Sequence, residues 1–214
     1  MADDQITDFP GKDIDVHFDK SLCIGVAECG RASGDLFQKG RSPWCMPDAS
    51  TPAEAREIVE RCPSGALSYT DKVGGTAEQV PAENCVTVVS DGPLYATGDL
   101  HIEGAPEDKP GLKTRAALCR CGQSKNKPFC DNSHRDSNFR DYGAVGDSGP
   151  GLESAGGPLE LKPIEHGPLL AKGNFKIRAA SGRIAWAGEK VALCRCGASE
   201  NKPFCDGKHR EIGW

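Results

Sequence analysis

Large apolar side chains are scarce in this chain of 214 residues. Aromatic residues make up 6% of the sequence and all hydrophobic residues 37%, whereas glycine (26) and proline (15) are plentiful. A chain with so little apolar material builds small cores under short strands and turns, and such modules usually need a metal or a disulfide to stabilise them. The composition therefore favours several small units over one large core.

Several features that would indicate other functions are also missing. No apolar run approaches the length of a membrane span, and Met1–Pro10 is acidic and polar, unlike a secretion signal. The net charge of −5 gives no general basic surface for nucleic acid. We recognise no nucleophile–base pair, phosphate loop or dinucleotide fingerprint. We therefore expect a cytoplasmic protein that binds neither membrane nor nucleic acid and is not a catalyst.

Cysteine, in contrast, is abundant, with 11 residues. Without an export signal a disulfide scaffold is not expected, and clustered cysteines in a cytosolic protein more often bind metal. Two clusters share the spacing C-x-C-x8-C-x3-H, which predicts two metal sites. Their members are Cys119, Cys121, Cys130 and His134, and Cys194, Cys196, Cys205 and His209.

The two clusters belong to a longer internal repeat. Residues 92–135 and 167–210 align without a gap at an offset of 75, with 22 identities in 44 positions. A gapless repeat indicates a duplicated folding unit, and two such units often pack about a pseudo-twofold axis, as two subunits would. We therefore expect a monomer that contains an internal pseudo-dimer.

The spacing alone leaves the kind of metal open. Three thiolates and one imidazole suit tetrahedral zinc. They equally suit a two-iron cluster, with two thiolates on one iron and a cysteine and a histidine on the other. The tight C-x-C pair and the gap of eight residues differ from common zinc spacings, but they do not decide between the two.

Both segments resemble the CDGSH iron–sulfur domain, whose pattern is C-x-C-x2-S/T-x3-P-x-C-D-G/S/A/T-x-H. The second copy matches every defined position, and the first departs only at Asn132, which tolerates a left-handed backbone. The resemblance implies a fold of short strands and a redox-active [2Fe–2S] cluster per repeat, held by the eight residues named above. Well-known members are homodimers with one motif per chain, so this chain resembles such a dimer fused into one polypeptide.

Three residue types recur between the ligands of both copies. We expect Ser124 to cap a turn or to donate a hydrogen bond toward sulfur, and Asp131 to stabilise the turn. Lys127 either offsets cluster charge or is a solvated surface residue. The histidine ligand raises the reduction potential of a cluster and can be protonated. We therefore predict that acid loosens both clusters, and that replacing His134 and His209 by cysteine slows the loss.

The first 72 residues predict a small β-α-β unit. Asp13–Asp19 alternates apolar and polar residues, as a half-buried strand does. A helix is expected from Thr51, with Pro52 in its first turn and Glu54 completing a capping box, up to the Cys62-Pro63 pair. Ala66–Thr70 then returns as a strand.

This unit contains a third set of cysteines, namely Cys23, Cys29 and Cys62. The set resembles a divergent single-cluster 4Fe–4S ferredoxin-like domain, in which Val26 stands where another cysteine is usual. Three thiolates suit a [3Fe–4S] cluster, or a [4Fe–4S] cluster with a non-cysteine fourth ligand. The alternative is a degenerate domain that holds no cluster and buries its cysteines as small apolar residues. Cys45 and Cys85 fit no ligand pattern and are interpreted as free thiols.

The sequence thus predicts an α+β protein in which a ferredoxin-like unit precedes two β-rich CDGSH repeats. The expected domains are residues 1–72, 85–142 and 158–214, joined by linkers over 73–83 and 143–157, the second of them flexible. The predicted function is electron transfer or cluster transfer to an unidentified redox or cluster-acceptor protein. The alternatives are a zinc-binding interaction module and an oxidoreductase component that acts with a partner.

Overall fold

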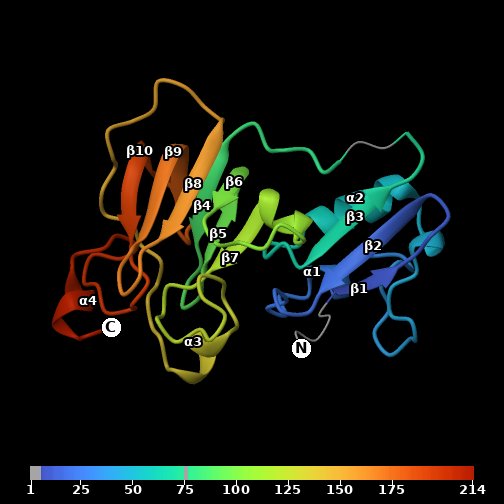
Figure 1. Ribbon diagram of the computed structural model, residues 1–214, viewed down its shortest axis with the longest axis horizontal. Coiled ribbons are helices and arrows are strands. Elements are labelled where there is room, and N and C mark those ends of the chain that lie inside the picture. The colour runs from blue at the N-terminus through green and yellow to red at the C-terminus, as the bar shows by residue number, and fades with distance from the viewer. Residues whose placement is uncertain (1–5, 75–76) are drawn as a thin grey trace.

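The computed structural model describes residues 6–74 and 77–214, and these are mostly β with few helices (Figure 1). A sheet of three strands forms the N-terminal part, and a mixed sheet of seven strands forms the rest. The expected α+β class is therefore correct only in part, because the helices that the sequence did not predict, α1 (Glu28–Arg31), α3 (Ser133–Asp136) and α4 (Lys208–Glu211), are single turns. In the described part of the chain, no helix is long and apolar enough to cross a membrane.

The N-terminal sheet is antiparallel, with β2 between β1 and β3. Helix α2 (Pro52–Glu60) packs on it through Ala55, Ile58 and Val59, and the capping box of Thr51 and Glu54 begins the helix as predicted. The predicted strands and helix are confirmed, but an additional edge strand, β1, precedes them. The strands are β1 (Ile6–Phe9), β2 (Ile14–Asp19) and β3 (Leu67–Asp71). The 3-10 turn η1 (Pro47–Ala49) lies between β2 and α2 in the chain.

The seven-stranded sheet is shared by the two repeats. From the first repeat come β4 (Asn84–Val88), β5 (Leu94–Thr97), β6 (Asp99–Ile102) and β7 (Arg115–Leu118), with the 3-10 turn η2 (Pro110–Lys113) before β7. From the second come β8 (Pro158–Pro163), β9 (Leu169–Arg178) and β10 (Ile184–Leu193).

The first strand of each repeat pairs with both repeats. Strand β4 runs antiparallel to β5 of its own repeat and parallel to β9 of the other, with Asn84 opposite Phe175. Strand β8 likewise runs antiparallel to β9 and parallel to β6, with Leu159 opposite Leu100. Each of these strand pairings therefore has an equivalent at an offset of 75 residues in the other repeat. Neither repeat completes its sheet alone.

Two glycines lie where the chain changes strand partners, one between β5 and β6 and one within β9. Gly98 separates β5 from β6 at φ 139°, and Gly173 lies within β9 at φ 130°. A Cβ atom at Gly98 would overlap the side chain of Asn84, and one at Gly173 would overlap the carbonyl oxygen of Pro158. Residues with a side chain rarely adopt this backbone conformation, so glycine is needed at both positions.

The N-terminal domain is packed against the first repeat. Leu22 and Ala66 belong to the main core of the seven-stranded sheet. Buried Arg115, at the start of β7, forms an ion pair with Glu78 at 2.6 Å and donates hydrogen bonds to the carbonyl oxygens of Val59, Cys62 and Leu67. The predicted first linker is thus anchored at Glu78; its residues Gly75 and Thr76 lie outside the described part.

The segment over 143–157, expected to be a flexible linker, is held against β10. The carbonyl oxygens of Gly143 and Ser148 accept hydrogen bonds from the amides of Ala180 and Ala187, at 3.0 and 3.1 Å. Val145 is buried in the main core. The glycines suit this path because several of them have positive φ angles, which residues with side chains rarely adopt.

Candidate metal centres

The eight predicted ligands of the repeats come together in pairs. Directly after β7, Cys119 Sγ lies 3.7 Å from Cys121 Sγ, and Cys130 Sγ lies 3.5 Å from Nδ1 of His134 on α3. The corresponding distances in the second repeat are 3.8 and 3.4 Å. Two sulfurs on one tetrahedral metal lie about 3.8 Å apart, and a sulfur and an imidazole nitrogen about 3.6 Å apart, given their usual bond lengths. Each pair therefore fits one shared metal atom.

The pairs do not merge into one four-ligand set. Across residues 6–74 and 77–214, no three His, Cys, Asp or Glu side chains converge on a single ion position. Burial raises the pKa of Cys130 to about 11, and nearby negative charge on Cys119 adds to this shift, so the pairs of one repeat are neighbours. Two adjacent pairs fit the donor set of a two-iron cluster.

Hydrogen bonds prepare the sulfurs for metal. A hydrogen bond joins the sulfurs of Cys119 and Cys121; it lowers the pKa of Cys119 to about 6 and raises the pKa of Cys121. Backbone amides of Gln123 and Asn132 point at the sulfurs of Cys121 and Cys130, at 3.5 and 3.4 Å. Because metal ligands must be deprotonated, donors aimed at sulfur favour the form that binds.

The turn between the ligand pairs is fixed by its own side chains. Ser124 Oγ donates to the carbonyl oxygen of Phe129 at 2.6 Å, and Lys127 Nζ donates to that of Ser124 at 2.6 Å. Burial acts to raise the pKa of Asp131, but hydrogen bonds from Ser133 and the amide of Lys125 outweigh it and lower the pKa to about 2. The expected turn-stabilising roles of Ser124 and Asp131 are confirmed, and Lys127 serves the turn as well.

Sequence reasoning overlooked the arginine inside each C-x-C pair. Arg120 is 1% exposed, donates to the carbonyl oxygens of Val89 and Gly92, and pairs with Asp141 at 2.5 Å. Its counterpart Arg195 donates to the carbonyl oxygens of Ile164 and Gly167. The guanidinium groups lie over the rings of Phe139 and Trp214, 5.0 and 5.3 Å from the centroids. The signal was available, since both arginines recur in the repeat.

The two ligand turns meet each other at their cysteines. Cys121 and Cys196, which are equivalent in the repeat, form an antiparallel bridge. A Cβ atom at Gly122 would lie 2.5 Å from the carbonyl oxygen of Cys196, and one at Gly197 2.6 Å from that of Cys121. Glycine after each C-x-C pair thus permits the close approach of the two sites.

The N-terminal cysteines are also brought together. Cys23, Cys29 and Cys62 line one cavity with Val26, as the sequence pattern predicts. Burial raises the pKa of Cys29, and negative charge on Cys62 and Cys23 raises it further, so the three thiols lie within electrostatic range. Cys45 lies elsewhere in the N-terminal core, where burial raises its pKa to about 12.

Comparison with known proteins agrees with this division. Residues 9–72 match the family described as divergent 4Fe–4S mono-cluster, and residues 91–135 and 166–210 each match the iron-binding zinc finger of CDGSH type. The chain is a divergent 4Fe–4S mono-cluster domain joined to two CDGSH repeats. CDGSH domains bind [2Fe–2S] clusters. Both resemblances drawn from the sequence are therefore confirmed.

The N-terminal family also has curated relatives. Two are the uncharacterized protein YjdI of Escherichia coli strain K12 and that of strain O157:H7. Each is 41% identical to this chain over 64 residues, which are 30% of this chain and 84% of the relative. No solved structure matches the chain.

The two CDGSH repeats differ in how deeply their third cysteine is covered. Cys130 is 3% exposed, whereas Cys205 is half-buried. The residue that departs from the CDGSH pattern, Asn132, has φ 73°, and its counterpart Gly207 has φ 90°. The left-handed turn is thus kept as expected. The two repeats differ here because Asn132 has a side chain that makes contacts, whereas Gly207 has none.

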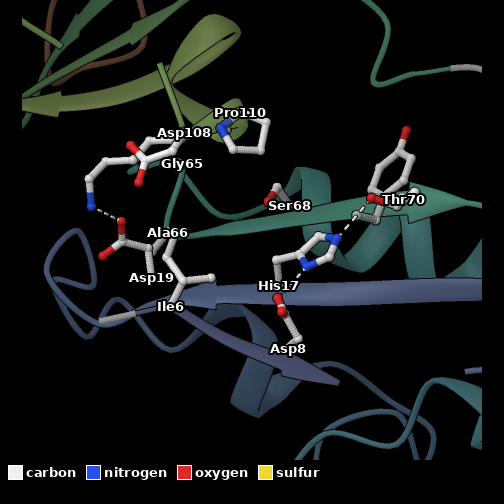
Figure 2. Close-up of a pocket in the computed structure, with 13 residues that line it drawn as sticks. Ile6, Asp8, His17, Asp19, Gly65, Ala66, Ser68, Thr70, Asp108 and Pro110 are labelled. Atoms are coloured by element: carbon white, nitrogen blue, oxygen red, sulfur yellow. Dashed lines mark hydrogen bonds and ion pairs between the residues drawn. The ribbon is translucent and has the colours of Figure 1, made fainter. Parts of the chain in front are cut away.

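A cavity of about 400 Å³ lies between the N-terminal sheet and η2 (Figure 2). On its wall His17 Nδ1 is 2.6 Å from Asp8 Oδ1, and His17 Nε2 is 2.8 Å from Thr70 Oγ1. A carboxylate, an imidazole and a hydroxyl joined in this order by hydrogen bonds activate the hydroxyl in some hydrolases, where the nucleophile stands on a sharp turn. Thr70 instead lies within β3, paired with Asp15. His17 on β2 therefore serves to link β1 and β3 by hydrogen bonds.

Proposed function

We propose that this chain is an electron carrier whose two CDGSH repeats each hold a [2Fe–2S] cluster. The observation that carries the proposal is the repeated pairing of ligands, at 3.7 and 3.5 Å in one repeat and 3.8 and 3.4 Å in the other. When bound, such a cluster accepts or donates one electron. The histidine in each set favours a higher potential than four thiolates would give.

The proposed ligands are those that the sequence indicated. One iron would be held by the C-x-C pair and the other by the later cysteine and the histidine. The chain positions these groups through the buried Arg120 and Arg195, and its amides donate hydrogen bonds to sulfur. The two sets are Cys119, Cys121, Cys130 and His134, and Cys194, Cys196, Cys205 and His209.

The N-terminal domain is proposed to hold a third cluster. Cys23, Cys29 and Cys62 share one cavity, and the matching family is described as a 4Fe–4S mono-cluster. Three cysteines leave one iron of a [4Fe–4S] cluster without a thiolate, so its fourth ligand would be another group. A [3Fe–4S] cluster needs no such ligand, and iron analysis separates the two.

The repeats are proposed to form an internal pseudo-dimer in a monomeric chain. Support comes from the pairing of β4 and β8 with strands of the other repeat, and from the bridge between the equivalent residues Cys121 and Cys196. Light scattering of the purified chain should give the mass of one copy. A stable dimer would contradict the proposal.

The proposal is tested by metal content and by matched ligand variants. Aerobically purified protein should contain iron and acid-labile sulfide, with visible absorption that dithionite bleaches. Cys130→Ser and Cys205→Ser should each remove one [2Fe–2S] cluster, and the double variant both. Stoichiometric zinc without iron or sulfide, in protein not exposed to excess zinc during expression, would indicate the zinc-binding interaction module instead.

Electron transfer and cluster transfer use the same ligands, so they need separate measurement. The reduced chain is mixed with an oxidised redox protein and, in a second experiment, with a metal-free [2Fe–2S] acceptor. Rapid reoxidation with the iron retained supports electron transfer. Movement of iron and sulfide to the acceptor without added chelator would indicate cluster transfer.

A further inference from the structure

Two asparagines of the first CDGSH motif hold the N-terminal cysteine loop. Asn126 Nδ2 donates to the carbonyl oxygen of Ser21, and Asn132 Nδ2 donates to that of Ile24, both at 2.9 Å. These carbonyls stand on either side of Leu22 and Cys23. The motif that carries one metal site is therefore hydrogen-bonded directly to the loop that carries another.

Side-chain packing closes the same interface. Ile24 is 3% exposed and packs in a cluster with Ala117 and Cys130, while Val26 and Tyr95 pack against this cluster. Burial raises the pKa of Tyr95, and negative charge on Cys130 and Cys62 raises it further, which places the ring within electrostatic range of a thiol from each site. The residue next to Cys23 thus contacts a proposed ligand of the first CDGSH site.

A cavity of about 340 Å³ continues this contact toward the histidine. Its walls come from both domains, with Ile24 and Val26 on one side and Tyr95, Asn132 and His134 on the other. The N-terminal loop therefore covers the first CDGSH site along the side where Cys130 and His134 lie.

The first repeat differs from the second where it touches the N-terminal domain. Lys109, which pairs with Asp19, corresponds to the exposed Ile184. Asn126 corresponds to Asn201, which is exposed, so the residue type alone does not create the contact. Three further substitutions relate the first repeat to the second, namely Tyr95 to Leu170, Arg115 to Lys190 and Asn132 to Gly207.

We propose that Asn126 and Asn132 fasten the N-terminal cysteine loop to the first CDGSH motif, so that these two metal sites exchange electrons within one chain. This inference rests on the proposed function. One electron leaves the N-terminal cluster, which is oxidised, and enters the first CDGSH cluster, which is reduced; no bond forms or breaks. The histidine ligand favours this direction, because it raises the potential of the acceptor.

The asparagines act as positioning residues. Electron tunnelling falls steeply with distance, so the rate depends on keeping the N-terminal loop packed, through Ile24, against Cys130. The asparagine carboxamides donate to backbone carbonyl oxygens of the loop, so these hydrogen bonds do not depend on the side chains of Ser21 and Ile24. Removing the carboxamides should loosen the loop and leave the ligands unchanged.

The repeat offers a matched control. The test variant is Asn126→Ala with Asn132→Gly, and the control is Asn201→Ala with Gly207→Asn. Asparagine and glycine both tolerate the left-handed conformation that Asn132 and Gly207 adopt, so neither exchange strains the turn. Asn126→Ala alone, against Asn201→Ala, tests the same contact without any change in the turn.

Two readouts apply to the intact chain. Hydrogen exchange of the amides over 21–29 should speed up by roughly tenfold in the test variant, because two hydrogen bonds to this loop are lost. In fully reduced protein, neighbouring paramagnetic clusters broaden each other's electron paramagnetic resonance signals. This interaction, and rapid electron arrival at the first CDGSH cluster, should be present in the wild type and the control and weakened in the test variant.

The outcomes separate this inference from the proposed function. Fully loaded wild type without magnetic interaction between the N-terminal and CDGSH clusters would overturn the inference and leave the proposed function standing. Equal effects of the test and control variants on the rate and the spectra would also overturn it. Protein that holds no iron–sulfur cluster would overturn both.

Discussion

The two CDGSH repeats hold nearly the same ligand geometry in different surroundings. The ligand distances agree within 0.1 Å, yet Cys130 is buried beneath Ile24 whereas Cys205 is half-buried. Residues within the motif therefore determine how the ligands are arranged. Residues far away in the chain determine how accessible each site is and what it contacts.

The largest expected difference between the repeats concerns Arg115 and its counterpart Lys190. Arg115 is 5% exposed and bridges Glu78 to three carbonyl oxygens, whereas Lys190 is exposed. Arg115→Ala would leave three carbonyl oxygens without their donor and the half-buried Glu78 carboxylate without its ion pair, and should lower the free energy of unfolding by about 3–5 kcal/mol. Lys190→Ala should change it by less than about 0.5 kcal/mol. Urea denaturation of both variants measures the difference.

A smaller and more symmetrical effect is expected at the strand bends. Gly98→Ala and Gly173→Ala each force a side chain into a positive φ, which costs about 1–3 kcal/mol of backbone strain. Gly98→Ala should be at least as damaging as Gly173→Ala, because its Cβ meets the Asn84 side chain, which is buried and held by three hydrogen bonds, whereas Gly173→Ala meets the carbonyl oxygen of Pro158. Thermal unfolding gives the order, and a larger loss for Gly173→Ala would show that the first repeat is the more adaptable.

At acidic pH the two CDGSH sites should lose their clusters at different rates. We expect the second site to lose its cluster severalfold faster, because Cys205 is more exposed than Cys130 and protons compete with metal for the ligands. The decay of visible absorption after a shift to acidic pH measures this, with the two cysteine-to-serine variants assigning each phase. His134→Cys and His209→Cys should each slow loss at their own site. Unchanged rates would argue against histidine ligation.

The smallest expected effect concerns the rings that lie under the arginines. Trp214 lies under Arg195 and also 5.7 Å from Lys127 of the other repeat, whereas Phe139 lies under Arg120. Trp214→Phe should cost about 0.5–1 kcal/mol of stability, the usual size of a partly exposed cation–π contact. Phe139→Trp, the reciprocal exchange, should cost no more. Guanidinium denaturation curves of the two variants test this ranking.

What the sequence predicted well depends on residues close together in the chain. The ligand pairs, the capping box at Thr51 and the left-handed turn at Asn132 are set by neighbours within a few positions, so spacing and propensity suffice. The three N-terminal cysteines were recognisable because their pattern is itself a family signature. The one predicted helix is present, and the single turns that follow the third cysteine of each repeat were not predicted, because four residues carry no helical periodicity.

What the sequence did not predict depends on distant contacts. Asn132 bonds to a residue 108 positions earlier, and Arg115 to one 56 positions earlier, and no local pattern marks either partner. Asn132 was expected only to keep a turn, yet its side chain serves the neighbouring domain. Strand β1 was overlooked because four residues of mixed polarity at the edge of a sheet carry little signal.

The exchange of β4 and β8 has a consequence for how the protein is made. While the ribosome is still synthesising the second repeat, β4 has one edge without a partner, because the strand that pairs with this edge is β9 of the second repeat. An open strand edge at this stage invites pairing with other nascent chains. The order of synthesis thus leaves a period in which the first half is vulnerable to aggregation, and only completion of the chain ends it.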